Sequence, residues 1–208
     1  MASLPKSAPA ERPRLLVVAG PNGSGKTSVT EQGLRHEWFR DCLYINPDNI
    51  ARDQFGDWNA PEAILQAARL ADTMREKAFA TGQSVAFETV LSTESKLDYL
   101  RRAKAAGYFI RLFFVGTESP AINAARITER FISGGHEVPI GKIVARYGRS
   151  MANSVTAARI ADRAYFYDNT PEDKPVRLIF RCKDGHPDKS YGSLPSWSEP
   201  IHAALRLG

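Results

Sequence analysis

The stretch GPNGSGKTS near the start of the chain has the residue types that bind phosphate groups. It fits the pattern G-x-x-x-x-G-K-[ST], with Gly20, Gly25, Lys26 and Thr27 at the fixed positions. Glycines let successive backbone N–H groups point at phosphate oxygens, and the N-terminus of a following helix adds partial positive charge. Lys26 is expected to reach the β- and γ-phosphates of ATP, and the Thr27 hydroxyl to ligate Mg²⁺. We assign ATP contacts to the whole stretch: Gly20, Pro21, Asn22, Gly23, Ser24, Gly25, Lys26, Thr27 and Ser28.

Two carboxylates follow apolar runs further along the chain. Asp48 follows CLYIN in the stretch NPDNIA, and Glu88 closes SVAFE. In an open parallel sheet, ligands bind beyond the carboxyl ends of the strands. A kinase needs one carboxylate to accept the proton of the acceptor hydroxyl, and often a second to hold substrate or Mg²⁺. The alternatives are a turn or helix cap for Asp48 and an ion pair at the sheet end for Glu88.

Five cations flank the stretch Gly134-Gly135-His136 in the second half of the chain. They are Arg126, Arg130, Lys142, Arg146 and Arg149. Small kinases close an Arg-bearing lid over the transferring phosphoryl group, and paired glycines suit the hinge of a lid. We therefore predict that the hinge brings arginines to the phosphates. The alternative is that the five cations form a solvated surface.

Apolar runs that alternate with helical patterns must position these residues. Strands are predicted at 14–20, 42–46, 84–88, 109–115 and 164–168, most without the alternation of a half-exposed strand. Continuous apolar strands are typical of a parallel sheet covered by helices on both faces. The predicted fold is α/β, a P-loop NTPase fold with about five mostly parallel strands and a small Arg-bearing lid.

The chain divides into three parts by composition. Residues 1–13 are expected to form a disordered tail, residues 14–182 the kinase domain with an added edge strand at 176–182, and residues 183–208 an irregular extension. The formal charge of +5 and the pI near 9.3 suit an anionic ligand. Two distant cysteines and the lack of an apolar run of about 20 residues predict a cytoplasmic protein with no membrane partner.

Other P-loop classes fit the sequence less well. Asp53-Gln54-Phe55-Gly56 matches D-x-x-G, but an Asn-Lys-x-Asp motif for guanine is absent, so we reject a switch GTPase. No apolar strand ends in the Asp-Glu pair of motor ATPases. A small-molecule kinase fits better.

Seven motifs in order resemble those of zeta toxin-like P-loop kinases, here in a short form. They span residues 14–170 and read GPNGSGKTS, INPDNIA, FETVLST, AKAAGYFIRLFFV, ARITERFISGGHEVP, RYGRSMANS and ADRAYFYDN. The resemblance implies an ATP- and Mg²⁺-dependent enzyme that phosphorylates the 3′-hydroxyl of UDP-N-acetylglucosamine. It also implies an antitoxin protein as partner.

The resemblance assigns roles to single residues. Lys26 and Thr27 carry the phosphate and metal roles, Asp48 is the general base, and Glu88 the acid on the substrate side, to which we add Thr89. Arg130 matches the first of two phosphate-contacting arginines and is assigned to catalysis, with Arg126 beside it at ATP. His136 stands where the second arginine is expected and is assigned to the substrate. Arg146 is then expected to supply the missing charge at ATP.

Three functions remain open from the sequence. The leading one is an ATP-dependent kinase of a small hydroxylated metabolite such as a UDP-sugar. The basic pI also permits a polynucleotide 5′-kinase, although aromatic and basic residues do not interleave as in proteins that stack bases, so nucleic acid is not the expected partner. The third is a weak ATPase that acts mainly as a protein bound by an antitoxin.

Replacing Lys26 by alanine tests the phosphate loop. Lys26→Ala removes the cation at the β- and γ-phosphates, so we expect phosphoryl transfer to fall on the order of 100-fold or more while the fold is kept. Turnover of radiolabelled ATP, with circular dichroism as the folding control, measures both. ATP turnover at the parental rate would show that the loop is not the nucleotide site.

Overall fold

The computed structural model describes residues 12–55, 60–132 and 139–207. The predicted tail (residues 1–13) falls almost wholly outside this part of the chain. So does the predicted lid hinge, with Gly134, Gly135 and His136.

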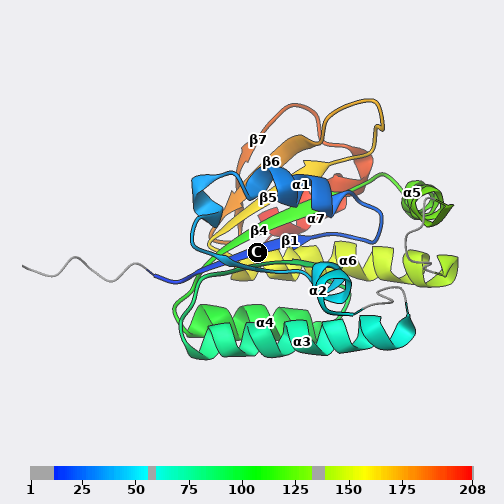
Figure 1. Cartoon of the computed structure of the whole chain (residues 1–208). Helices are drawn as coiled ribbons and strands as arrows, with labels where there is room; N and C mark the ends of the chain where they lie inside the picture. The colour runs from blue at the N-terminus through cyan, green and yellow to red at the C-terminus, as the bar shows by residue number, and fades with distance from the viewer. Residues whose placement is uncertain (1–11, 56–59, 133–138, 208) are drawn as a thin grey trace, which may run out of the picture.

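A seven-stranded sheet in the order β2-β3-β1-β4-β5-β6-β7 forms the centre of the molecule (Figure 1). The parallel strands are β1 (Arg14–Ala19), β2 (Leu43–Ile45), β3 (Val85–Thr89), β4 (Phe109–Gly116) and β5 (Arg163–Asp168). All five lie where apolar runs predict strands. Two antiparallel strands, β6 (Arg177–Lys183) and β7 (His186–Ser190), extend the sheet beyond β5. The α/β class is confirmed, and the count of about five strands is corrected to seven.

The additional strand β7 comes from a tight hairpin that the sequence analysis did not identify. Asp184 and Gly185 both have positive φ, 48° and 86°, as the two central residues of a type I′ turn do. Asp-Gly is the favoured pair for this turn. The strand itself, HPDKS, is polar and lies at the edge of the sheet, so it lacks the apolar signal of the buried strands.

Helices cover both faces of the sheet, as the parallel strands require. Figure 1 shows α3 (Pro61–Ala80), α4 (Glu94–Ala105) and α6 (Ile140–Ile160) on one face and α1 (Lys26–Gly33) on the other. The remaining elements are α2 (Pro47–Gln54), α5 (Pro120–Ile132), α7 (Glu199–Arg206), and the short 3-10 helices η1 (Glu37–Phe39) and η2 (Ser196–Ser198). None of the helices in the described ranges has the length and apolar character to cross a membrane.

The larger apolar core lies on the face with α3, α4 and α6, and a smaller cluster lies under α1. The largest fully buried rings of the larger core are Phe114, Phe166 and Phe180, from three adjacent strands. Burial of such rings removes a large apolar area from water, which is the main favourable term in folding.

The C-terminal part is more regular than the sequence analysis expects. Residues 183–208 contain β7, η2 and α7, and Trp197, Ile201 and Leu205 pack into the larger core. Ile201 and Leu205 lie four residues apart, so they occupy one face of α7. A short amphipathic helix after a Pro- and Ser-rich stretch gives too few residues for a clear periodic signal, which explains the wrong prediction.

The close packing of Trp197 on Gly116 generates a stability prediction. A Cβ at Gly116 would lie 2.3 Å from the Trp197 ring, so Gly116→Ala should destabilise the fold by about 1–3 kcal/mol through overpacking. Gly148, inside α6, has open space around its Cβ position and is the matched control. There Gly148→Ala should stabilise by roughly 0.5–1 kcal/mol. Urea unfolding of both variants measures the difference, and equal free energies of unfolding would contradict it.

Candidate active site

The phosphate loop connects β1 to α1 and is closed in by neighbouring atoms at three of its glycines. Gly20, Gly23 and Gly25 have φ of 149°, 76° and 89°, which residues with a Cβ rarely adopt. A Cβ at Gly20 would lie 2.2 Å from the carbonyl oxygen of Val115, and one at Gly25 would lie 2.2 Å from Nδ2 of Asn169. The glycines are therefore required both by the turn and by its neighbours.

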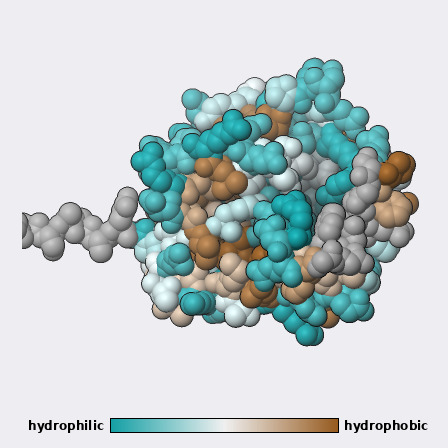
Figure 2. Space-filling model, in the orientation of Figure 1, coloured by the Kyte–Doolittle hydropathy of each residue, from teal (hydrophilic) through white to brown (hydrophobic). Residues whose placement is uncertain are grey.

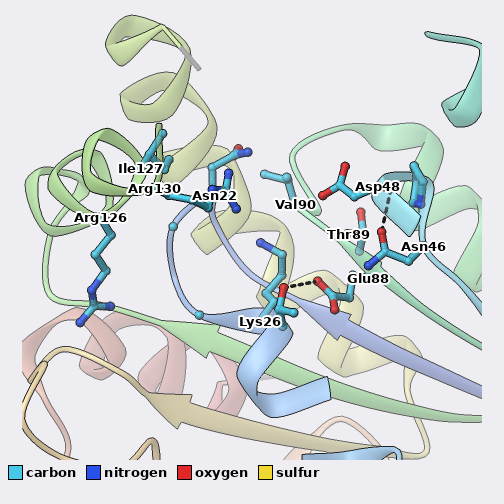
Figure 3. Close-up of a pocket in the computed structure, with 14 residues that line it drawn as sticks. Asn22, Lys26, Asn46, Asp48, Glu88, Thr89, Val90, Arg126, Ile127 and Arg130 are labelled. Carbon is cyan, nitrogen blue, oxygen red and sulfur yellow. Dashed lines mark hydrogen bonds between the residues drawn. The ribbon is translucent and has the colours of Figure 1, made fainter. Parts of the chain in front are cut away.

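A pocket of about 420 Å³ opens beside this loop, at the carboxyl ends of β1 and β3 and the start of α2 (Figure 3). Its lining brings together most of the predicted site residues. They are Asn22, Gly23, Gly25, Lys26, Thr27, Asn46, Pro47, Asp48, Glu88, Thr89, Val90, Arg126, Ile127 and Arg130. The space-filling view has the orientation of Figure 1 and shows hydrophilic and apolar residues side by side on this face of the molecule (Figure 2).

Lys26 carries the positive charge at the floor of the pocket. Its Nζ donates to the carbonyl oxygen of Pro21 at 2.9 Å. Desolvation lowers the pKa of Lys26 to about 8; Glu88 and Asp48 oppose this shift, and Arg130 adds to it. Anionic phosphates would reverse the shift, because an adjacent negative charge favours the ammonium form.

Glu88 stands closer to the phosphate loop than its predicted substrate role suggests. One of its carboxylate oxygens, Oε2, lies 3.4 Å from the Thr27 hydroxyl, which donates to it. The other, Oε1, accepts a hydrogen bond of 2.9 Å from the Tyr44 hydroxyl. The carboxylate thus lies between the residue expected to ligate Mg²⁺ and the end of β2.

Asp48 lies in the first turn of α2 with its side chain exposed to the pocket. The helix cap is Asn46, whose Oδ1 accepts a hydrogen bond from the Asp48 backbone N–H at 2.9 Å. Pro47 occupies the first turn, where its missing N–H costs no hydrogen bond. The Asp48 carboxylate is therefore not used as a cap and faces the pocket, where a hydroxyl substrate could reach it.

Two arginines of α5 reach the pocket from the side opposite Asp48 (Figure 3). Arg126 is anchored by the loop after β5: Nη1 donates to the Asn169 carbonyl at 2.8 Å, and Nη2 to the Thr170 carbonyl at 3.3 Å. Arg130 is exposed, and its positive charge is close enough to lower the pKa of Lys26. Both arginines line the pocket, and their contacts with phosphates stay predictions.

Other predicted residues lie elsewhere. Arg146 is half-buried in α6 and Ser28 is exposed on α1, and neither is among the residues that line the pocket. Three residues of the phosphate loop are buried beneath its surface: Gly20, Pro21 and Ser24. His136 falls outside the described residues, so its assignment to the substrate stays a prediction.

Sequence reasoning missed three residues that shape the site. Tyr44 holds the Glu88 carboxylate, Asn46 accepts from the backbone N–H of Asp48, and Asn169 donates from Nδ2 to the Ser24 carbonyl of the phosphate loop at 2.9 Å. Asn46 precedes a proline, which is a readable cap signal. Tyr44 and Asn169 belong to no spacing pattern and become visible only when the strand ends meet.

The donor atoms fit a hard cation. The Thr27 hydroxyl and the Glu88 carboxylate are oxygen donors of the kind that Mg²⁺ prefers, and nucleotide phosphates commonly complete its coordination. Within the described ranges, no group of three or more His, Cys, Asp or Glu side chains could hold a metal by itself. The protein residues present thus suit a cation that is bound together with the triphosphate.

Comparison with known proteins identifies the family. The family model described as Zeta toxin matches residues 2–170 of this chain. An uncharacterized protein of Haemophilus influenzae is 30% identical over 138 residues, which are 64% of this chain and 92% of that protein.

Solved structures share the fold at low sequence identity. A chain of the AvrRxo1-ORF1:-ORF2 complex with ATP has a TM-score of 0.65 and 17% identity, over 95% of this chain and 64% of that one. This chain therefore spans less than two thirds of its length. The PezAT toxin-antitoxin system of Streptococcus pneumoniae gives a TM-score of 0.56 and 16% identity, over 83% of this chain and 72% of that one.

The low pKa of Lys26 predicts proton uptake when ATP binds. Near pH 8.5 part of the free protein carries neutral Lys26, and triphosphate binding should return the proton, whereas at pH 6 the amine is already charged. Calorimetric titrations in two buffers of different ionisation enthalpy measure the protons taken up. Lys26→Met should abolish the uptake at pH 8.5. Equal uptake by the parent and Lys26→Met would assign the proton to another group.

Proposed function

The chain belongs to the zeta toxin family of P-loop kinases, and from this premise we propose that it transfers the γ-phosphoryl group of ATP to a hydroxyl of a small metabolite. A nucleotide-sugar such as UDP-N-acetylglucosamine is the proposed acceptor class. The observation that carries this proposal is the shared pocket: Lys26, Thr27 and Glu88 form one wall, and Asp48, at the start of α2, belongs to another.

The chemistry follows from the two walls of the pocket. Asp48 accepts the proton of the acceptor hydroxyl, whose oxygen attacks the γ-phosphorus as the bond to the β,γ-bridging oxygen breaks and ADP leaves. Lys26 balances the charge on the β- and γ-phosphates, and Arg126 and Arg130 approach from α5. A bound Mg²⁺ would neutralise phosphate charge, and Thr27 would hold it. Little covalent chemistry falls to the protein, so positioning and electrostatics dominate.

Arg126 and Arg130 of α5 favour a function in phosphoryl transfer over a function in nucleotide binding alone. An Arg130 guanidinium can span two phosphate oxygens with its planar fork, which suits a transferring phosphoryl group. An antitoxin that covers the pocket and a cytoplasmic location are further parts of this proposal. They rest on family membership and on the sequence.

A panel of acceptors tests the reaction. The protein is incubated with γ-labelled ATP and Mg²⁺ together with UDP-sugars, oligonucleotides with a free 5′-hydroxyl, or water alone. We expect label on a UDP-sugar. Label on the oligonucleotide would instead identify a polynucleotide 5′-kinase, and release of phosphate alone would identify an ATPase.

Replacing Asp48 by asparagine tests the proton acceptor. An amide cannot take the hydroxyl proton, so Asp48→Asn should lower transfer by roughly 100-fold or more and leave ATP affinity within about twofold. Asp53→Asn is the matched control, because Asp53 lies on the same helix and does not line the pocket. Transfer rates and calorimetric ATP titrations provide the two measurements. Loss of ATP affinity with transfer retained would assign Asp48 to nucleotide binding.

A further inference from the structure

A continuous chain of hydrogen bonds connects the two sides of the pocket. It runs from the Asp48 backbone N–H to Asn46 Oδ1 (2.9 Å), and from Asn46 Nδ2 to the Tyr44 hydroxyl (3.0 Å). From there it continues to Glu88 Oε1 (2.9 Å), while Thr27 donates to Glu88 Oε2 (3.4 Å). Figure 3 shows the bonds at its two ends. Four elements, α2, β2, β3 and α1, thus share one chain of contacts.

The chain has a fixed direction. Asn46 uses its oxygen to accept from the Asp48 N–H, so its NH₂ group is the one that faces Tyr44. The Tyr44 oxygen accepts that bond, and its only proton therefore points at Glu88. Burial, with the charge of Glu88, raises the pKa of the Tyr44 hydroxyl, so Tyr44 remains a donor over the physiological range.

These contacts fix both oxygens of the Glu88 carboxylate. Oε1 is held by Tyr44 and Oε2 faces Thr27, so rotation of the carboxylate toward the acceptor side would break a bond to a charged group. The support comes from β2, a three-residue strand at the edge of the sheet. Its register opposite β3 places Tyr44 beside Ala86, on the same side of the sheet as Glu88 two residues further along.

We infer that Tyr44 is a positioning residue of this kinase: with Asn46 it holds the Glu88 carboxylate against Thr27 and couples that carboxylate to the turn that carries Asp48. The inference rests on the proposed function for its effect on turnover, but its effect on nucleotide binding is independent of the acceptor. Glu88 therefore serves the phosphate side of the reaction, and the acceptor side is left to Asp48 and its neighbours.

Removal of the single hydroxyl tests this inference. Tyr44→Phe keeps the ring, which packs on the smaller apolar cluster, and removes the donor to Glu88. Tyr165→Phe is the matched control, because Tyr165 packs on the same cluster and does not line the pocket. Both variants, a Glu88→Gln variant and the Tyr44→Phe/Glu88→Gln double variant are checked for folding by thermal unfolding.

The first measurement is the gain in affinity for a fluorescent ATP analogue when Mg²⁺ is added. Tyr44→Phe should reduce this gain at least threefold, and Tyr165→Phe should leave it unchanged. The second measurement is turnover, where kcat of Tyr44→Phe should fall on the order of tenfold with a smaller change in KM for the acceptor. In the Glu88→Gln background, Tyr44→Phe should have almost no further effect, because Tyr44 acts through Glu88.

Defined results would overturn the inference. One is a Tyr44→Phe protein that behaves like Tyr165→Phe, and another is full additivity of the Tyr44 and Glu88 substitutions. If Tyr44→Phe does not fold, Asn46→Asp replaces it, because it keeps the acceptor for the Asp48 N–H and removes the donor to Tyr44. A parent protein that phosphorylates no acceptor would contradict the proposed kinase function, whereas the nucleotide titrations would still decide the role of Tyr44.

Discussion

The site depends on one steric constraint: the phosphate loop has no space for side chains where it meets its neighbours. The backbone of β4 lies against Gly20, the backbone of Asn123 against Gly23, and the side chain of Asn169 against Gly25. Because the loop is held from three directions, its N–H groups keep their orientation before any ligand arrives. Preorganised donors of this kind need no rearrangement when phosphate binds, which favours both binding and transfer.

Charge in the pocket is arranged around that fixed loop. Lys26 and the arginines of α5 provide positive charge, Glu88 lies beside Thr27, and Asp48 lies on the side opposite the arginines. The cost of desolvating Lys26 is visible in its lowered pKa. A protein without ligand therefore holds a partly destabilised cation, and the triphosphate relieves this destabilisation on binding.

The sequence predicted most of the frame, because its signals were strong and local. Buried parallel strands are continuous apolar runs, and the phosphate loop has fixed spacing, so β1 to β5 and Lys26 were found in the right places. The polar strand β7 and the short helix α7 carry weak signals and were missed. Tyr44 and Asn169 were missed for another reason: their importance lies in which strand ends become neighbours, and sequence distance does not encode this. Arg146 of α6 is not among the residues that line the pocket, so its assignment to ATP stays a prediction.

The contacts of Trp197 bear on the order in which the site matures. Its indole Nε1 donates to Asp168, the last residue of β5, at 3.0 Å. The next residue, Asn169, contacts both the phosphate loop and Arg126. The family model matches residues 2–170, so Trp197 lies outside the matched region. A ribosome makes the phosphate loop well before it makes Trp197. A nascent chain would thus carry an unbraced nucleotide pocket until Trp197 has been made, so the pocket would mature later than its own loop.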